Sequence, residues 1–341
     1  MDRIRISGSP LARGRQLGEE LRDKVRATWD FYGEVVFSVT PFDLEEEGAA
    51  YHDVIRSFHA DYGEEISGMA EGSGLRPWQL AVLNARTELM HRSVYRAGVG
   101  ECTAAYFPDT CVLAQNWDWM DALEELMVLV EMEREDGHRI LQLTEPGILG
   151  KIGLNSAGIG VCLNILSGRA SPPAVPVHVL LRAVLDAPSL PAARSVIEAA
   201  RFGTCSHLLV GDAEGGSLSL ELYGDECVEV DHGERVPRHT NHYVGVARDQ
   251  SGDPLLENSH GRFDRASELL VSAGDQSVDR MKAVLLDRTG PHAICADWTS
   301  LGPLRLGTVC SIVMDLPRRE LQITPGNPRN HGFERFSLLG D

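Results

Sequence analysis

The sequence contains no stretch that approaches the roughly 18 to 20 uninterrupted apolar residues of a membrane span. We also expect no secretory leader, because the first residues, MDRIRISGSPLARG, carry charges with no apolar segment behind them. Of its 341 residues 43% are hydrophobic, as in an ordinary globular protein. We therefore expect a soluble cytoplasmic protein with no membrane partner.

Positive charge is also scarce. The chain has 32 Lys and Arg against 50 Asp and Glu, which gives a formal net charge of −18. Such a surface repels phosphate backbones and anionic lipid headgroups over a Debye length of about 8 to 10 Å. Nucleic acid is excluded as a partner on this ground.

Cysteine is present in an odd number, and the seven residues are widely spaced. Without an export signal, this pattern favours free thiols in a reducing compartment over a disulfide framework. The glycines between Gly153 and Gly160 lack the GxGxxG or Walker spacing, so they predict strand packing and no cofactor. A chemical role for a thiol remains open.

The first hundred residues have a helical pattern. Apolar residues recur every four positions from Leu17 to Trp29 and from Ala50 to Tyr62, which lines one face of a helix. A third helix is predicted from Pro77 to Met90, because proline is favoured in a first turn.

From Cys102 onward, short apolar runs broken by Gly, Asp and Asn predict strands, interrupted by two pairs of helices. The predicted strands are 111–117, 126–132, 140–143, 158–164, 206–211, 218–223, 308–315 and 320–323, and the predicted helices are 177–185, 190–200, 255–273 and 278–286. This order favours an α+β architecture of antiparallel sheets covered by helices over a parallel sheet. No internal repeat or low-complexity linker divides the chain.

The segment GECTAAYFPD, residues 100–109, lies where the helical pattern gives way to strands, and AQNWDW follows it. From the residues alone, Cys102 has two interpretations. It is either a nucleophile at the mouth of a strand or a buried structural cysteine that packs as a small hydrophobe.

Several motifs in order decide between these interpretations. GECT, AQNWDW, LNSAGIGVCLN, HTNH and the opening ISGSPLARGRQLGEEL resemble the acyl-coenzyme A:6-aminopenicillanic acid acyltransferase family, also called peptidase family C45. The resemblance runs from residue 6 to residue 242, with weaker likeness at 308–316. It implies a four-layer αββα N-terminal-nucleophile hydrolase fold, in which two antiparallel sheets lie between helical layers.

The resemblance further implies an inactive precursor, or zymogen, that cleaves itself between Glu101 and Cys102. The helical segment 1–101 and the nucleophile-bearing core 102–341 would then stay associated as one structural domain. After cleavage the new α-amino group of Cys102, with an ordinary pKa of about 7.7 to 8.0, can act as general base to its own thiol. One departure is Glu101, because the penicillin enzyme has glycine there.

Three further catalytic residues follow from the resemblance. Asp118 occupies the position of a family aspartate near the nucleophile, where a carboxylate could orient the new ammonium. Asn241 in HTNH corresponds to an asparagine whose amide supplies an oxyanion-hole donor. For a late family arginine we choose Arg305, with Arg262 as the second choice.

The predicted function is a cysteine amidohydrolase that acts on a small N-acyl or aminoacyl amide through a Cys102 thioester. Alternatives are an acyltransferase that passes the acyl group to an amine, a papain-like Cys-His enzyme and a non-catalytic binding protein. A metal hydrolase would use His239 and His242 with Cys205 or His207, but H-x-x-H is not the zinc helix signature H-E-x-x-H. No metal is predicted, and the sequence leaves substrate and homo-oligomer formation undecided.

Overall fold

The structure is a computed structural model that describes residues 1–93, 102–168, 173–233, 235–250, 252–271, 274–301 and 304–339. Glu101, on the amino side of the predicted cleavage bond, lies outside these residues. Cys102, on the other side, is described. In the described part of the chain, no helix combines the length and apolarity that crossing a membrane requires.

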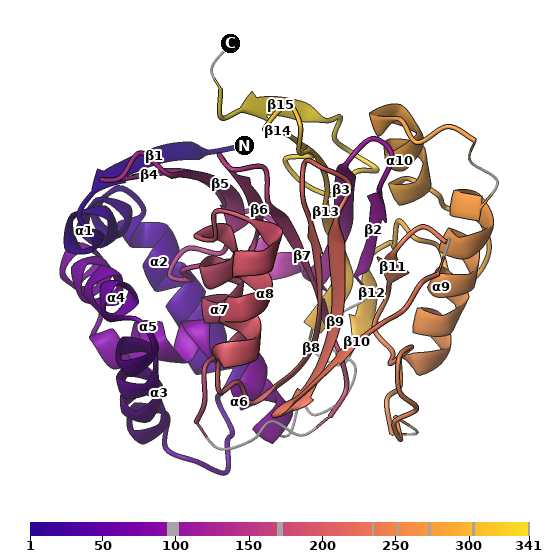
Figure 1. The fold of residues 1–341 in the computed structure, drawn as a ribbon. Helices are drawn as coiled ribbons and strands as arrows, with labels where there is room; N and C mark the ends of the chain where they lie inside the picture. The colour runs from indigo at the N-terminus through magenta and orange to yellow at the C-terminus, as the bar shows by residue number, and fades with distance from the viewer. Residues whose placement is uncertain are drawn as a thin grey trace.

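Two β-sheets face each other and helices cover both outer faces (Figure 1). The first sheet has the order β1-β4-β5-β6-β7-β8-β9-β10. Its strands are β1 (Arg3–Gly8), β4 (Val128–Arg134), β5 (Arg139–Thr144), β6 (Ile152–Asn155), β7 (Gly160–Ile165), β8 (Thr204–Gly211), β9 (Ser217–Gly224) and β10 (Glu226–Glu229).

The second sheet has the order β11-β2-β3-β13-β14-β15, and β12 pairs with β13. Its strands are β2 (Thr103–Phe107), β3 (Val112–Met120), β11 (Arg238–His239), β12 (Thr299–Leu301), β13 (Leu304–Asp315), β14 (Glu320–Ile323) and β15 (Glu334–Ser337). This sheet contains the strand that follows the predicted cleavage bond.

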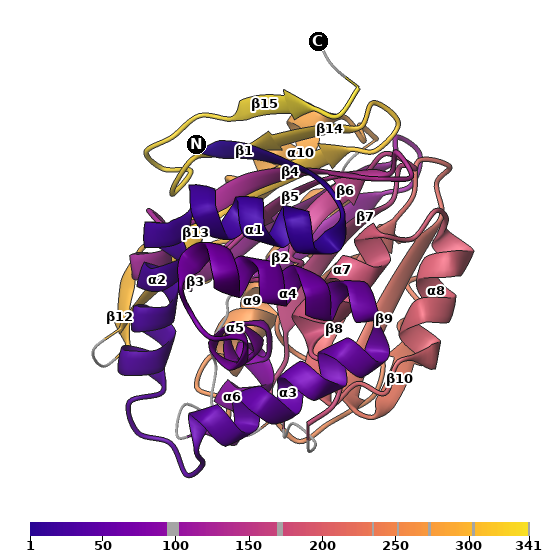
Figure 2. The same ribbon diagram turned by 90° about the vertical axis from the view of Figure 1, so that its left-hand side faces the viewer.

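Helices α1 to α8 lie on the outer side of the first sheet, and α9 and α10 lie on the outer side of the second (Figures 1 and 2). The first group is α1 (Pro10–Glu20), α2 (Arg22–Trp29), α3 (Leu44–Phe58), α4 (Ala60–Ser73), α5 (Pro77–Asn84), α6 (Arg86–Arg92), α7 (Val177–Leu185) and α8 (Leu190–Ala199). The second is α9 (Leu256–Val271) and α10 (Val278–Leu285), and two short helical turns are η1 (Asp30–Val36) and η2 (Asp121–Leu123).

Close packing of α1 against α4 depends on glycine. A Cβ atom on Gly68 would lie 2.1 Å from the carbonyl oxygen of Leu11, and one on Gly14 would lie 2.0 Å from that of Glu65. Neither position can hold a side chain without separating the two helices. This contact belongs entirely to the segment before Cys102.

The α+β class and the predicted sheets are confirmed, with corrections to single elements. The helix predicted from Leu17 to Trp29 is divided at Leu21, and the helix predicted from Pro77 to Met90 is divided at Ala85. Residues 3–8 form a strand inside the region predicted to be helical, and this strand pairs with β4 in parallel, whereas only antiparallel pairs were expected. The helix predicted from Ala50 to Tyr62 is interrupted at His59, whose backbone is extended at φ −152° and ψ 117°. Apolar spacing alone does not reveal the break, because apolar residues continue at the same spacing across it.

One large apolar core fills the space between the sheets and the space beneath helices α1 to α8. It contains residues from before and after Cys102, for example Leu83 and Leu89 on one side and Trp117 and Leu163 on the other. A second, smaller core packs α9 and α10 against the outer face of the second sheet. The predicted nucleophile therefore lies on an inner strand that is covered on both sides.

Candidate active site

The sheet register brings three of the predicted residues to one place. Cys102 immediately precedes β2, whose first residue Thr103 pairs with Asn116 on β3. On its other side β2 pairs with β11, where His239 lies opposite Ala104. Asp118 lies two residues after Asn116 on β3, and Asn241 lies two residues after His239. Both residues therefore flank the first residues of β2.

Cys102 is buried, with 3% of its surface exposed. Its Sγ donates to the carbonyl oxygen of Asp118 at 3.7 Å. Its own carbonyl oxygen accepts two hydrogen bonds, from Arg262 Nη1 at 2.8 Å and from Asn164 Nδ2 at 3.0 Å. The residue is therefore fixed at both its side chain and its main chain.

The thiol is poorly ionised in these surroundings. Burial, followed by the neighbouring Asp118 carboxylate, raises the pKa of Cys102 to about 11. Asp118 itself is buried and lies opposite Thr308, where the register between β3 and β13 shifts. Such an irregularity re-aims side chains near a strand end. A base that takes the thiol proton would make this group a stronger nucleophile at neutral pH.

Asn241 contacts both the first sheet and the arginine at Cys102. Its Nδ2 donates to the carbonyl of Ile165 at 2.8 Å, and its Oδ1 accepts from Arg262 Nη2 at 3.1 Å. Its backbone N–H donates to Ser259 Oγ at 2.8 Å. The amide group is thus held with its donor side toward the space between the two sheets.

The structure separates the two arginines that the sequence offered. Arg262, on α9, is fully buried and donates to Cys102, Thr103 Oγ1 at 3.1 Å and Asn241. The side chain of Arg305 is 54% exposed and forms an ion pair with Asp121 at 3.2 Å. Arg305 therefore points to solvent at the end of β13, whereas Arg262 lies beside Cys102 and Asn241.

Asn164 was not singled out in the sequence, although it ends the motif LNSAGIGVCLN. It lies on β7 of the first sheet and reaches across to Cys102 of the second. The available signal was a polar residue at the end of an otherwise apolar run. A strand in the core accepts such a residue only when its polar atoms are bonded.

Gln115 and Asn116, which precede Asp118 on β3, bond to backbone groups of neighbouring elements. Gln115 bonds both backbone groups of Leu163, with Nε2 donating to the carbonyl at 2.5 Å and Oε1 accepting from the N–H at 2.8 Å. Asn116 donates to the carbonyls of Leu285 and Ile294 at 2.8 and 2.9 Å. These bonds tie β3 to the opposite sheet, to the last residue of α10 and to the segment after α10.

The histidines considered for a metal have other partners. His239 Nε2 lies 2.9 Å from Glu221 Oε1, and His242 Nδ1 lies 2.9 Å from Ser259 Oγ. His207 stacks on His239 with ring centroids 3.6 Å apart. Within the described ranges, no group of three or more His, Cys, Asp or Glu side chains is arranged to hold a metal ion.

Comparison with solved structures shows which known fold this chain has. The fold matches a point mutant of conjugated bile acid hydrolase from Clostridium perfringens with a TM-score of 0.50 and 12% identity, over 71% of this chain and 93% of that one. Penicillin V acylase from Agrobacterium tumefaciens gives a TM-score of 0.48 and 13% identity, over 70% and 86%. The fold is that of the N-terminal-nucleophile hydrolases.

The sequence comparison gives the family. The model of the acyl-coenzyme A:6-aminopenicillanic acid acyl-transferase family matches residues 107–330, and the chain belongs to this family. The 40 kDa form of acyl-coenzyme A:6-aminopenicillanic-acid-acyltransferase from Emericella nidulans is 28% identical over 346 residues. That alignment covers 96% of this chain and 93% of the fungal protein.

Proposed function

We propose that the chain is a cytoplasmic, self-processing amidohydrolase of peptidase family C45 that acts on a small N-acyl or aminoacyl amide through a thioester on Cys102. The observation that carries the proposal is the environment of Cys102. A buried thiol at the head of an inner strand is combined with a fixed main chain, a carboxylate and donor groups from two separate elements, β7 and α9.

The maturation step starts from the uncut chain. The Cys102 thiol attacks the carbonyl carbon of Glu101, its Sγ–C bond forms, and the peptide nitrogen leaves as the α-amine of Cys102. Water then opens the thioester and releases the new carboxylate of Glu101. The zymogen thereby gains a base that it lacked, because a peptide nitrogen cannot accept the thiol proton and the α-amine can.

Turnover repeats this chemistry on the substrate. The α-amine takes the thiol proton, and Sγ attacks the amide carbonyl. The C–N bond of the substrate then breaks as the α-ammonium returns the proton to the leaving amine, which gives an acyl-enzyme that water hydrolyses. Asn241 is the proposed amide donor to the tetrahedral oxyanion, and one such donor is typically worth about 2.7 to 4 kcal/mol. Asp118 is proposed to orient the ammonium, and Arg262 replaces Arg305 as the arginine that holds Cys102 and Asn241 together.

Hydrolysis and acyl transfer share the thioester and differ only in the acceptor, which is water or an amine. The Emericella nidulans relative is named as an acyltransferase and the Clostridium perfringens neighbour as a hydrolase. We favour hydrolysis, since nothing in the sequence indicates a penicillin-type pathway. Acyl transfer to an added amine is the second candidate.

Intact mass spectrometry tests the proposal. Fresh protein should give two pieces, residues 1–101 and 102–341, and a panel of acyl amides should add an acyl mass to the larger piece. Cys102→Ala should stay whole and inactive. Cys102→Ser should cleave slowly and turn over poorly, since a hydroxyl is a weaker nucleophile at neutral pH. An uncut chain with full activity, or an active Cys102→Ala variant, would disprove the assignment.

A further inference from the structure

A row of hydrogen-bonded polar side chains crosses the first sheet and ends at Cys102. Asn164 Nδ2 donates to the carbonyl oxygen of Cys102 at 3.0 Å and to that of His239 at 3.4 Å. On the other side of the amide, Asn164 Oδ1 lies 3.1 Å from His207 Nδ1. The row continues from His207 Nε2 to Ser219 Oγ at 2.9 Å, and from Ser219 Oγ to His232 Nε2 at 2.9 Å.

The chemistry of the partners fixes the direction of every bond in this row. Both groups facing Asn164 Nδ2 are carbonyl oxygens, so the NH₂ of the amide must point to them and its oxygen must face His207. His207 Nδ1 therefore carries a hydrogen. Burial lowers the pKa of His207 well below its usual range, so the ring is neutral and Nε2 has a lone pair. Ser219 donates to that lone pair and accepts from His232.

The His207 ring has little freedom to turn. It is fully buried and stacks on His239 with ring centroids 3.6 Å apart and an interplanar angle of 9°. His239 is held in turn by Glu221 Oε1 at 2.9 Å and by the carbonyl of Thr240 at 2.8 Å. The donor that fixes Asn164 is thus positioned by bonds and packing from both sheets.

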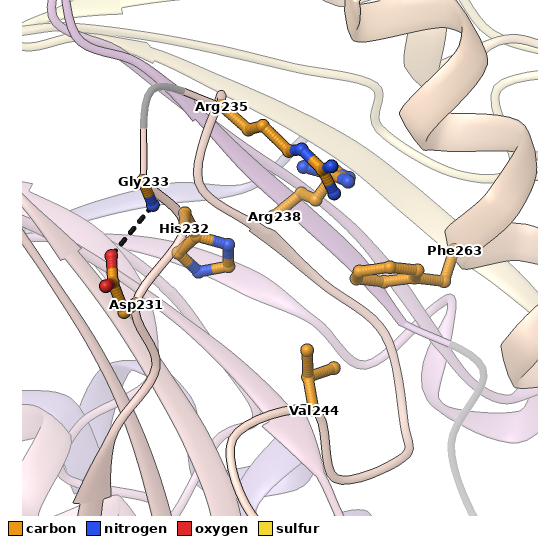
Figure 3. Close-up of a pocket in the computed structure, with 7 residues that line it drawn as sticks. All are labelled: Asp231, His232, Gly233, Arg235, Arg238, Val244 and Phe263. Carbon is orange, nitrogen blue, oxygen red and sulfur yellow. Dashed lines mark hydrogen bonds between the residues drawn. The ribbon is translucent and has the colours of Figure 1, made fainter.

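The outer end of the row reaches the surface. His232 lines a cavity of about 780 Å³ whose wall also includes Arg238 and Phe263 (Figure 3). Arg238 lies opposite Ala105 on β2, whereas Asn164 contacts Cys102 from the space between the sheets. The row therefore connects the rim of the sandwich with the interior in which Cys102 lies.

We propose that His207 and Ser219 are positioning residues for the thioester chemistry, and that they act by holding the Asn164 amide in the orientation that anchors the carbonyl of Cys102. A reversed amide would place its oxygen against that carbonyl, and two acceptors would then face each other without a hydrogen. The inference rests on the proposed role of Cys102. Neither residue touches the reacting atoms.

The first test does not depend on activity. Nitrogen-15 NMR of imidazole-labelled protein at neutral pH should show His207 as the Nδ1–H tautomer, with Nε2 as the acceptor. Ser219→Ala should shift the Nε2 resonance of His207 and leave its protonation site unchanged. The Nε2–H tautomer, or a charged ring, would overturn the proposal even if Cys102 proved to be the nucleophile.

The second test compares two substitutions of one residue. In His207→Asn the amide nitrogen takes roughly the place of Nδ1, whereas in His207→Gln it takes roughly the place of Nε2. Per cleaved chain, His207→Gln should lose about tenfold in kcat with KM within about threefold, and His207→Asn should stay within about threefold of the parent. Equal losses in the two variants would contradict the role of the Asn164 bond.

A double-mutant cycle shows through which residue His207 acts. His207→Gln should add almost nothing to the loss of kcat caused by Asn164→Ala. The effects of substitutions within one hydrogen-bond chain are not additive. Ser219→Ala should lose about threefold to tenfold in kcat, whereas Ser73→Ala, a buried serine that donates to Met69 O within α4, should stay at the parental value. Full additivity would refute the proposal. Absence of any thioester in the parent would instead refute the proposed function and leave the tautomer result standing.

Discussion

Arg262 is the residue at which the chemistry of a single side chain can be tested most directly. Its guanidinium donates through Nη1 to Cys102 and Thr103, through Nη2 to Asn241, and through Nε to Asn258 Oδ1 at 2.6 Å. An ammonium group has the same charge but is a single compact donor, so it cannot span these acceptors. Replacing Arg262 with lysine therefore keeps the positive charge and removes the hydrogen-bond geometry.

We expect Arg262→Lys to lower kcat by about 10²-fold or more, whereas Arg305→Lys should stay within about twofold of the parent. The second substitution alters an exposed ion pair, which is worth roughly 0 to 1 kcal/mol. Steady-state kinetics checks these values of kcat, and the extent of self-cleavage is measured in parallel for each variant. An equal loss of kcat in the two variants would contradict the choice of Arg262 and favour Arg305 as the catalytic arginine.

At the scale of elements, a buried ionic cluster joins helix α6 and the turn η1 to the segment after β5. Glu145 accepts from Arg86 Nη2 and from Tyr32 Oη, each at 2.6 Å, and it is also paired with Lys151. Trp119 Nε1 donates to Tyr32 Oη at 2.8 Å and so connects the cluster to β3. The cluster lies across the division between residues 1–101 and 102–341.

Burial alone would raise the pKa of Glu145, but the charges of Arg86 and Lys151 outweigh it and lower the pKa to about 2. A carboxylate with a depressed folded-state pKa adds stability above its unfolded pKa of about 4.3, and this stability is lost as the pH falls toward 2. Replacing it with a neutral amide leaves the buried Arg86 guanidinium without its partner. Burial already lowers the pKa of Lys151 to about 7, so this lysine can release its proton when Glu145 is lost.

In the uncut Cys102→Ala background, Glu145→Gln should lower the free energy of unfolding by about 3 to 5 kcal/mol at pH 7. The difference should shrink between about pH 4.5 and pH 2, where the native carboxylate itself becomes protonated. Urea unfolding at several pH values measures this difference in the free energy of unfolding. The exposed Glu135→Gln is the matched control and should change stability by less than about 0.5 kcal/mol. A constant difference across the acid range would contradict the assignment.

At the scale of the whole molecule, the predicted cut would fall within one continuous structure. Strand β1, from the first piece, pairs along six residues with β4 of the second. Glu65 on α4 forms a buried ion pair with Arg182 on α7 at 2.7 Å, and Tyr62 donates to Asp186 at 2.8 Å. Both contacts join the two pieces, as does the shared apolar core.

We therefore expect the two pieces to remain together after cleavage. Buried pairs and apolar contacts are screened little by salt, so size-exclusion chromatography in about 1 M NaCl should elute both pieces in one peak. Denaturant, and not salt, should separate them. Separate elution in salt alone would mean that the pieces dissociate on maturation and would refute the two-chain enzyme.

Much of the layered architecture could be predicted from the sequence, because local patterns determine it. The helix over 177–185 and the strand over 320–323 have the predicted bounds, since periodicity and the residues that start and stop each element are local properties. Strand β1 was missed because an edge strand needs a partner, and β4 lies more than a hundred residues away. The break at His59 was missed because the apolar spacing continues across it.

The sequence by itself determined the identity of the candidate nucleophile, since motifs around Cys102, Asp118 and Asn241 occur together in one order. Only the tertiary structure decided which other side chains reach Cys102. Arg262 and Asn164 come from a helix and a strand far from it in the chain, and their roles depend on sheet register and helix packing. A single sequence records which donors exist, whereas folding determines where their hydrogen bonds are directed.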